Sequence, residues 1–174
     1  MRITKSTKDH TSMKQNLFKD LVQECQLAAP GSRLSGKLKK KIEEIGKDDR
    51  KDVVGQTEEG CAPLFLACKN GSADVVEYLL STCGAEIEQR GVFEVPEEGV
   101  SHSVTPLWCA AVAGRLSVVK VLLRYGADVD AASDSGSTPI RSACYIVRSE
   151  MQSSHFEIVR LVLRQFVQRK FVQE

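Results

Sequence analysis

Apolar residues recur about one helical turn apart in two similar stretches of the chain. Residues 75–80 read Val-Val-Glu-Tyr-Leu-Leu, and residues 118–123 read Val-Val-Lys-Val-Leu-Leu. This spacing is typical of a helix that is buried along one side. Each stretch follows a shorter apolar segment that opens with proline, at residues 62–68 and 105–111. The pattern therefore predicts two successive pairs of helices built on one plan.

The spacing of the prolines identifies the type of repeat. Pro106 and Pro139 are 33 residues apart, which is the period of ankyrin repeats. Pro63 and Pro106 are 43 residues apart, so about ten extra residues lie between the first two copies. The sequence predicts an all-α ankyrin-repeat solenoid, in which helix-turn-helix units are joined by hairpin fingers and each unit gains its core from its neighbours.

The residues expected at the ends of the helices agree with this plan. The prolines suit the first helical position, where a backbone N–H is not needed, and Thr105 and Thr138 precede two of them at the natural N-cap. Gly71 and Gly114 each follow a proline by eight residues. We expect both glycines to end a short helix in the left-handed conformation.

The beginning of the chain is less regular. Residues 1–12 are polar and are expected to be disordered. Residues 14–29 and 34–45 each carry an apolar stripe and are predicted helices, whereas the charged residues 46–60 are predicted to be loop. The predicted ankyrin domain spans residues 13–174 and divides into a degenerate opening repeat that caps the stack (13–60), a repeat with an acidic insertion (61–100), a regular repeat (101–133) and a repeat with an inserted loop (134–174).

Composition narrows the class of protein. The 174 residues have a net charge of +1, with no long apolar run and no signal peptide, so we expect neither nucleic acid nor membrane as a partner. None of the six cysteines forms a C-x-x-C pair, and Cys68, Cys109 and Cys144 fall on small-residue core positions. Reduced, buried thiols in the cytoplasm, or also in the nucleus, are expected.

No arrangement of residues predicts catalysis, a metal or a cofactor. Gly31 to Lys37 resembles a phosphate-binding loop, which leaves a nucleotide-dependent enzyme as one hypothesis, but Leu38 stands where a hydroxyl is required. The lysine-rich run 37–41 is either a nuclear or nucleic-acid signal or, because Leu38 continues an apolar stripe, the solvated face of a helix. We expect a binding protein and not an enzyme.

The insertion between the first two copies is the first candidate binding element. Residues 84–100 contain five glutamates, Glu94 and Glu97 among them, against one arginine, a net charge of −4, and they include Phe93. An acidic loop with an exposed aromatic residue suits a basic peptide. The alternative is a solvated loop in which Phe93 packs into the fingers.

Two residues of the later repeats have similar open alternatives. Trp108, the single tryptophan, either packs against the neighbouring finger or forms part of a peptide-binding wall. Arg141 holds the equivalent position in the third copy and either neutralises nearby glutamates or binds a peptide carboxylate. At the end of the chain, residues 156–172 are too apolar for a terminal cap and are expected to be covered by a further repeat or by a partner, or else to be prone to aggregation.

Several of these motifs together resemble one family. Residues 104–114 and 137–144, and an acidic insertion with a Phe-acid pair, are similar to the Fem (feminization-type) ankyrin family. The resemblance covers roughly residues 60–163. It implies a substrate receptor of a cullin-RING ubiquitin ligase, which binds C-terminal degrons, notably those that end in arginine, on the concave ankyrin face.

The resemblance also implies roles for single residues. Phe93 and Glu94 would occupy the family's Phe-Asp position, Ser137 its pocket serine, and Trp108 part of the wall. The family's second pocket acid is replaced here by Ile146. A ligase adaptor is an expected partner only of a longer protein, because the family's docking box lies beyond the repeats. A generic ankyrin scaffold or inhibitor that binds a folded protein is the alternative function.

Overall fold

The computed structural model describes residues 5–95, 99–150 and 153–171. Helices dominate these residues, and a single two-stranded hairpin interrupts them. The elements are α1 (Lys5–Leu27), α2 (Gly36–Glu44), α3 (Lys47–Gly55), α4 (Pro63–Asn70), α5 (Ala73–Ser81), β1 (Gly91–Val95), β2 (Val100–Val104), α6 (Pro106–Val112), α7 (Leu116–Arg124), α8 (Pro139–Glu150) and α9 (Ser153–Phe171).

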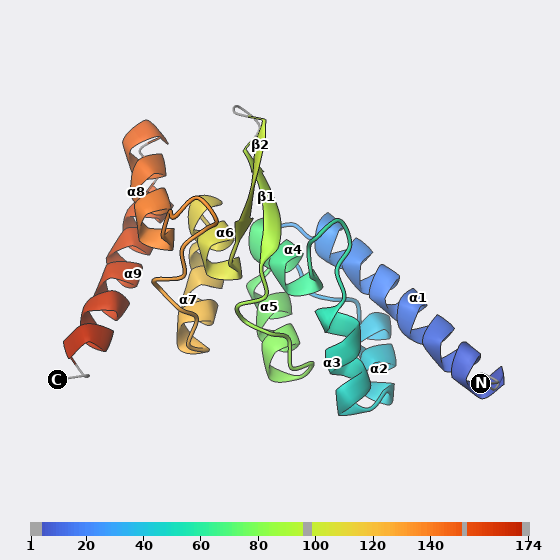
Figure 1. Ribbon diagram of the computed structural model, residues 1–174. Coiled ribbons are helices and arrows are strands. Elements are labelled where there is room, and N and C mark those ends of the chain that lie inside the picture. Colours follow the sequence, from blue (N-terminus) through green and yellow to red (C-terminus); the bar gives the residue numbers. More distant parts are fainter. Residues whose placement is uncertain (1–4, 96–98, 151–152, 172–174) are drawn as a thin grey trace.

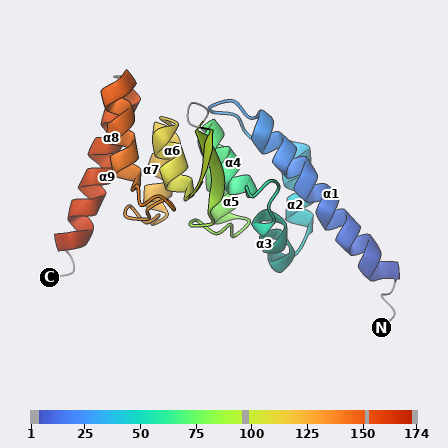
Figure 2. The ribbon, with the colours of Figure 1, turned by 45° about the horizontal axis from the view of Figure 1, so that its top comes forward.

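The helices form a two-layered stack. The first helices of successive repeats, α4, α6 and α8, contact one another in turn, and so do the second helices, α5, α7 and α9. The two ends of the chain lie at opposite ends of the stack (Figures 1 and 2), and the β1–β2 hairpin projects beyond the helices near its middle (Figure 1). The predicted all-α ankyrin solenoid is confirmed.

The predicted residues at the helix ends are also confirmed. The Thr105 side chain accepts a hydrogen bond from the Trp108 backbone N–H at 3.3 Å and so caps α6. Gly71 and Gly114 have φ angles of 89° and 68°. A side chain is strained in this left-handed conformation, so glycine is favoured where each first helix gives way to the second.

The opening of the chain differs from two of the predictions. Helix α1 begins at Lys5, so residues 5–12 are helical and not disordered. Residues 47–55, which were predicted to be loop, form α3. Two acidic residues in its first turn favour the helix, and Val53 and Val54 are almost completely buried. Lys14 of α1 forms ion pairs with Asp49 and Asp52 of α3, which ties the two helices together.

The acidic insertion forms a hairpin and not an irregular loop. Strands β1 and β2 pair in antiparallel register, with Gly91 opposite Val104 and Phe93 opposite His102. We call this hairpin the finger. At its base a Cβ on Gly91 would lie 2.4 Å from the Phe65 ring, so only glycine allows the strand to approach α4 this closely. A separate core cluster lies here, composed of Cys61, Phe65, Val104, Trp108 and Cys109.

Cys68 and Cys109 are buried as predicted, but Cys144 is exposed. The equivalent small residues of the earlier repeats, Cys68 and Ala111, are fully buried. They are covered because the next repeat packs on them, whereas the outer side of α8 faces no further helix among the described residues. Burial raises the pKa of Cys25 and Cys109 to about 12.

The insertion in the third copy lengthens a helix. Helix α8 has 12 residues against seven in α6, so the repeat 134–174, which was expected to contain an inserted loop, is helical from Pro139 to Glu150. The departure from the family pattern at Ile146 thus falls within α8, and the side chains of residues 146–150 are outside the described set. No helix among the described residues has the length and apolar character needed to span a membrane.

Candidate peptide-binding site

The base of the finger brings two predicted site residues together. Phe93 of β1 meets Trp108 of α6 edge-on, with ring centroids 5.4 Å apart and an interplanar angle of 70°. The ammonium group of Lys69 lies 5.6 Å from the centroid of the Phe93 ring, within range of a cation–π interaction. Trp108 therefore packs against the finger, as the first of its two alternatives proposed.

The two rings differ in what they offer to a ligand. Trp108 is 6% exposed, whereas Phe93 is half-buried and presents part of its ring to solvent. The indole Nε1–H of Trp108 is buried and has no hydrogen-bond acceptor among the described residues. Phe93 is thus the accessible aromatic surface, and Trp108 supports it from below.

Glu94 lies on the other face of the finger. Successive side chains of a strand point to opposite faces, so Glu94 points away from the side that Phe93 occupies. It is exposed and lines a hollow of about 330 Å³. Glu58, Glu59 and Lys69 also line this hollow, together with apolar residues that include Leu66 and Val92. Three carboxylates and one ammonium group give the hollow a negative balance.

Hydrogen bonds fasten the finger to the segment that connects α7 with α8. Asp134 accepts hydrogen bonds from the Ser103 backbone N–H at 2.9 Å and interacts with His102 Nδ1 at 3.1 Å. The Ser103 backbone N–H, followed by His102, holds the pKa of Asp134 below its usual value of 3.8. Arg90 donates to the carbonyls of Ser103 and Ala132 at 3.0 and 2.7 Å.

Sequence reasoning missed this fastening. The sequence pattern assigned no role to His102, Asp134 or Arg90. The signal that could have found them is the alternation of residues 91–95 and 100–104 around Pro96 and Gly99, which is typical of a hairpin. A hairpin of that length reaches the connection that follows α7.

Ser137 is the last residue of the turn 133–137, which Asp134 bonds to the finger, and Arg141 follows in α8. The Ser137 hydroxyl shares a hydrogen bond of 2.7 Å with Ser142, and its backbone N–H donates to the Ser133 hydroxyl at 3.1 Å. Arg141 is exposed and forms no ion pair with any residue that the structure describes, so neutralisation of a nearby glutamate is not observed there. No hydrogen bond or ring contact among the described residues joins either of them to Phe93. The turn 133–137 connects them to the finger through Asp134.

Glu97, also predicted as a site residue, lies outside the described residues. Phe93 and Trp108 are thus in contact, Glu94 is adjacent on the opposite face of the same strand, and Ser137 and Arg141 belong to the neighbouring repeat. Within the described residues no group of three or more His, Cys, Asp or Glu side chains is placed to hold a metal ion.

The motifs near the N-terminus have structural roles. The carboxylate of Glu24 accepts hydrogen bonds from the Ser35 backbone N–H at 2.8 Å and from its hydroxyl at 2.5 Å. A side-chain anion therefore occupies the start of α2, where the phosphate-loop interpretation required a nucleotide. Leu38 is buried, and Lys41 pairs with Asp20 of α1 at 3.0 Å. The lysine run is the solvated face of α2.

Comparisons with known proteins agree with the repeats seen in the structure. Residues 107–163 match the family described as ankyrin repeats (many copies), and residues 59–89 match the family described as ankyrin repeat. Together they cover the helix pairs from α4 to the larger part of α9. The matches thus support a module that binds other proteins.

Similar curated proteins carry the fem-1 name. A fem-1 homologue of Drosophila melanogaster is 46% identical over 79 residues, which are 45% of this chain and 12% of that protein. The sex-determining protein fem-1 of Caenorhabditis elegans is 38% identical over 91 residues (52% and 14%). Fem-1 homologue A of Rattus norvegicus is 36% identical over 102 residues (59% and 15%).

The aligned region is therefore a small part of each of these relatives. The aligned residues cover about half of the present chain, as expected from the resemblance in the sequence motifs. The chain is an ankyrin-repeat protein, and its repeats are similar to those of the fem-1 proteins.

Proposed function

We propose that this chain recognises the C-terminal segment of a substrate protein on behalf of a cullin-RING ubiquitin ligase. The observation that carries the proposal is the accessible Phe93 ring, which Trp108 supports on one face of the finger, while the opposite face borders an acidic hollow. A finger with an aromatic anchor on one face and carboxylates on the other suits a peptide that combines apolar and basic side chains. The ligase context is an inference by analogy from the family resemblance of the sequence motifs, and the similarity to the fem-1 proteins supports that resemblance.

Each candidate residue has a separate task in this proposal. The basic side chain of the peptide enters the hollow that contains Glu94, where Glu58 and Glu59 add negative charge. An arginine is favoured over lysine because its planar guanidinium group can bind a carboxylate through two hydrogen bonds. Apolar parts of the peptide lie against Phe93. Arg141, which has no acidic partner among the described residues, receives the terminal carboxylate.

Ser137 and Glu97 complete the proposed site. The Ser137 hydroxyl is already engaged with Ser142, so it acts by fixing the turn beside Arg141 and offers one remaining lone pair to the peptide. Glu97, which lies outside the described residues, contributes a further negative charge to this part of the sequence. Delivery of the substrate to a ligase adaptor is proposed for the longer protein that the fem-1 relatives represent, since this chain aligns with 12–15% of their length.

A binding measurement with matched peptides tests this function. A fluorescent peptide that ends in arginine is compared with the same peptide carrying a C-terminal amide, by fluorescence polarisation. We expect only the free carboxylate form to bind well, and Arg141→Ala to remove most of that difference. Glu94→Gln should weaken binding of the arginine peptide at least about tenfold. Arg164→Ala and Glu44→Gln change exposed residues far from the finger and serve as controls.

Equal binding of the two peptides would contradict recognition of a chain terminus and would favour the generic ankyrin scaffold. Absence of binding by both would remove the degron interpretation altogether. A peptide that binds equally well to the Glu94→Gln and control variants would place the contact elsewhere on the stack.

A further inference from the structure

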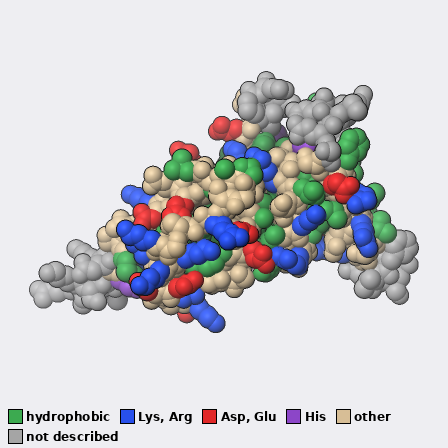
Figure 3. Space-filling model, turned by 180° about the vertical axis from the view of Figure 1, so that it is seen from behind, with side chains coloured by type: hydrophobic (Ala, Val, Ile, Leu, Met, Phe, Trp, Pro, Cys, Tyr) green, Lys and Arg blue, Asp and Glu red, His purple; other side chains and the backbone are tan. Residues whose placement is uncertain are grey.

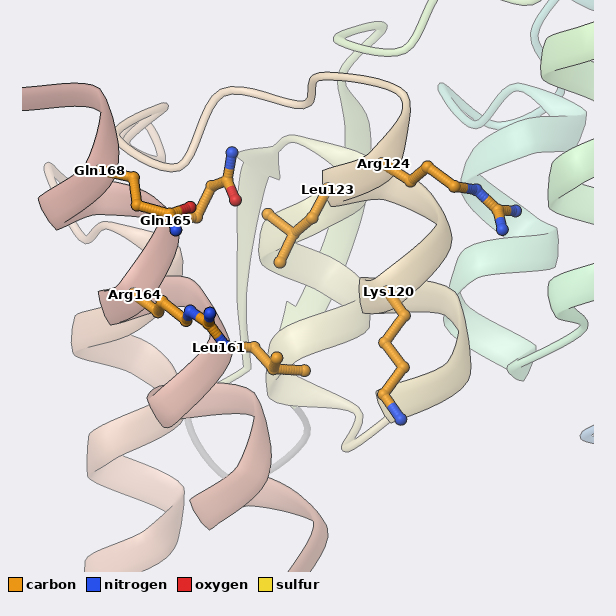
Figure 4. A pocket seen from close by; sticks show the side chains of 7 residues that line it. All are labelled: Lys120, Leu123, Arg124, Leu161, Arg164, Gln165 and Gln168. Atoms are coloured by element: carbon orange, nitrogen blue, oxygen red, sulfur yellow. The ribbon is translucent and has the colours of Figure 1, made fainter. Parts of the chain in front are cut away.

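Among the hollows described, the one between α7 and α9 is lined by basic side chains and by no carboxylate. It has a volume of about 500 Å³ and lies in the layer of second helices, whereas the proposed peptide site lies on the finger and the first helices (Figure 4). Lys120 and Arg124 of α7 and Arg164 of α9 line it, and no carboxylate is among its described lining residues. Leu123 and Leu161 add apolar surface between the two helices.

The excess of positive charge is not shared by two other hollows of the stack. The hollow between α2 and α5 has two cations and two carboxylates in its lining, and Arg33 pairs there with Asp74 at 2.5 Å. The hollow between α1 and α2 contains Asp20 and Glu44 against the single cation Lys41. A groove between neighbouring helices is thus a regular feature of the stack, but only the α7–α9 groove carries positive charge alone among those described.

Two of its three cations have no acidic partner among the described residues. Arg124 pairs with Glu77 at 2.7 Å, so part of its charge is satisfied within the protein. Lys120 and Arg164 are exposed and form no ion pair with any residue whose position is described. They stand on opposite walls of the groove, one on α7 and one on α9 (Figure 4).

The groove has a firm second wall because α9 is longer than the other second helices. Helix α9 has 19 residues, whereas α5 and α7 have nine each. Arg169, in the added turns, donates hydrogen bonds of 3.0 Å to the carbonyls of Gly126 and Ala127 and approaches Asp128 at 3.4 Å. These bonds hold the end of α9 against the turn that follows α7. Gln168, from the same added turns, contributes an amide to the groove.

We propose that this groove is a second docking site, which binds an acidic segment of a partner protein. Carboxylates of the segment pair with Lys120 and Arg164, and a leucine-like side chain between them lies on Leu123 and Leu161. The amide of Gln168 can hydrogen-bond to the partner's backbone. The two sites thus differ in preference, since the finger presents carboxylates and this groove presents cations.

The same observations favour a peptide over a nucleic acid. Recognition of a phosphate backbone needs a continuous basic stripe. On the face of the molecule seen from behind, basic and acidic side chains are interspersed (Figure 3), and the net charge of the chain is only +1. Leucine side chains in the groove offer apolar contacts, which match an amphipathic peptide better than a phosphate backbone.

A selection from a phage-displayed library of random peptides of about twelve residues tests the proposal. We expect enrichment of peptides that combine Asp or Glu with Leu or Ile. Their binding should fall at least about tenfold in the double charge reversal Lys120→Glu/Arg164→Glu. The conservative pair Lys120→Arg/Arg164→Lys should retain it. The matched reversal Arg33→Glu/Lys39→Glu, in the hollow beside α5, and Phe93→Ala, in the finger, should also leave it unchanged.

Circular dichroism melting checks the fold of each variant: we expect the charge reversals to melt close to the native protein, and Phe93→Ala to melt lower while remaining folded at the temperature of the binding assay. The proposal is overturned if no acidic sequence is enriched, or if the enriched peptides bind the Lys120→Glu/Arg164→Glu protein as well as the native one. It is equally overturned if a duplex DNA of about 20 base pairs binds through Lys120 and Arg164 and displaces the selected peptides, because the groove would then be a nucleic-acid site.

Discussion

The ring of Phe93 meets the indole of Trp108 edge-on at 5.4 Å, although the two residues belong to different elements of the repeat. The contact exists because β1 and β2 fold back over α4 and α6, with Gly91 admitting the strand against Phe65. One aromatic ring is nearly covered and the other is half exposed. The finger therefore presents a supported aromatic surface, on which the proposed peptide site depends.

Removal of the Phe93 ring should weaken peptide binding more than it weakens the fold. Phe93→Ala loses the edge-on contact and part of a buried side chain, so we expect a cost of about 2 kcal/mol in the free energy of unfolding. Affinity for an arginine-ending peptide should fall at least about tenfold. Phe156→Ala is the matched control, because Phe156 is 51% exposed in the last repeat. Equal peptide affinity of both variants would exclude Phe93 from the site.

The close approach of the finger to α4 should make Gly91 intolerant of a side chain. In Gly91→Ala the new Cβ would lie 2.4 Å from the Phe65 ring, which the buried cluster at the finger base cannot accommodate without rearrangement. We expect a loss of about 2 kcal/mol, measured by urea denaturation. Gly36→Ala, with open space around its Cβ at the start of α2, should change stability little. Similar stabilities of the two variants would contradict the described packing.

The fastening of the finger should depend on pH. The pKa of Asp134 is lower in the folded protein than its usual value of 3.8, because the Ser103 backbone N–H and His102 stabilise the carboxylate. A group with a depressed folded pKa contributes stability above its unfolded pKa and loses it as the pH falls through the folded pKa.

We therefore expect Asp134→Ala to melt at a lower temperature than the native protein at pH 7, with the difference shrinking below pH 3.8. Thermal melts of both proteins across that range provide the measurement. A difference that stays constant as the carboxyl group becomes protonated would show that the charge of Asp134 contributes nothing to the fastening.

Cys144 should be the reactive thiol among the described cysteines. It is exposed, whereas the other five are buried, and burial raises the pKa of Cys83 to about 11. A thiol reagent such as Ellman's should modify one cysteine rapidly in the native protein and none in Cys144→Ala. Rapid modification of several thiols in Cys144→Ala would contradict the packing of the repeats.

The reactivity of Cys144 can also show whether a further repeat packs on the outer face of α8 and α9. Leu163 and Val167 on α9 are 48% and 42% exposed. A consensus capping repeat appended after α9 should bury such surface, raise the melting temperature and slow the modification of Cys144. An appended repeat that leaves both quantities unchanged would mean that the outer face of α8 and α9 does not accept a further ankyrin unit.

The regular part of the fold could be predicted because each repeat depends on a few local signals. Pro106 with its Thr105 cap, and the glycine that follows eight residues later, determine where a first helix begins and ends, and the valine and leucine stripe determines the buried side of α7. These signals act within one or two turns. They are visible without knowledge of the neighbouring repeats.

The rest of the fold depends on tertiary contacts that the sequence does not display. Helix α3 has only Val53 and Val54 as buried residues, and its charged face is fixed by Lys14 from a distant helix. The burial of Cys144 was predicted from its repeat position, but burial at that position requires a following repeat. At the site, the contact of Phe93 with Trp108 could be proposed from the sequence. The interactions of the Asp134 carboxylate with the Ser103 backbone N–H and with His102 could not, because they join segments about 30 residues apart.

Trp108 provides the most direct test of the central claim that the finger and first helices bind the end of a polypeptide. It is the single tryptophan of the chain and lies against Phe93, so its fluorescence reports on this site alone. Titration with a peptide that ends in arginine should change the emission saturably, whereas the amidated peptide should have little effect. A peptide that binds by calorimetry but leaves the Trp108 emission unchanged would contradict the account.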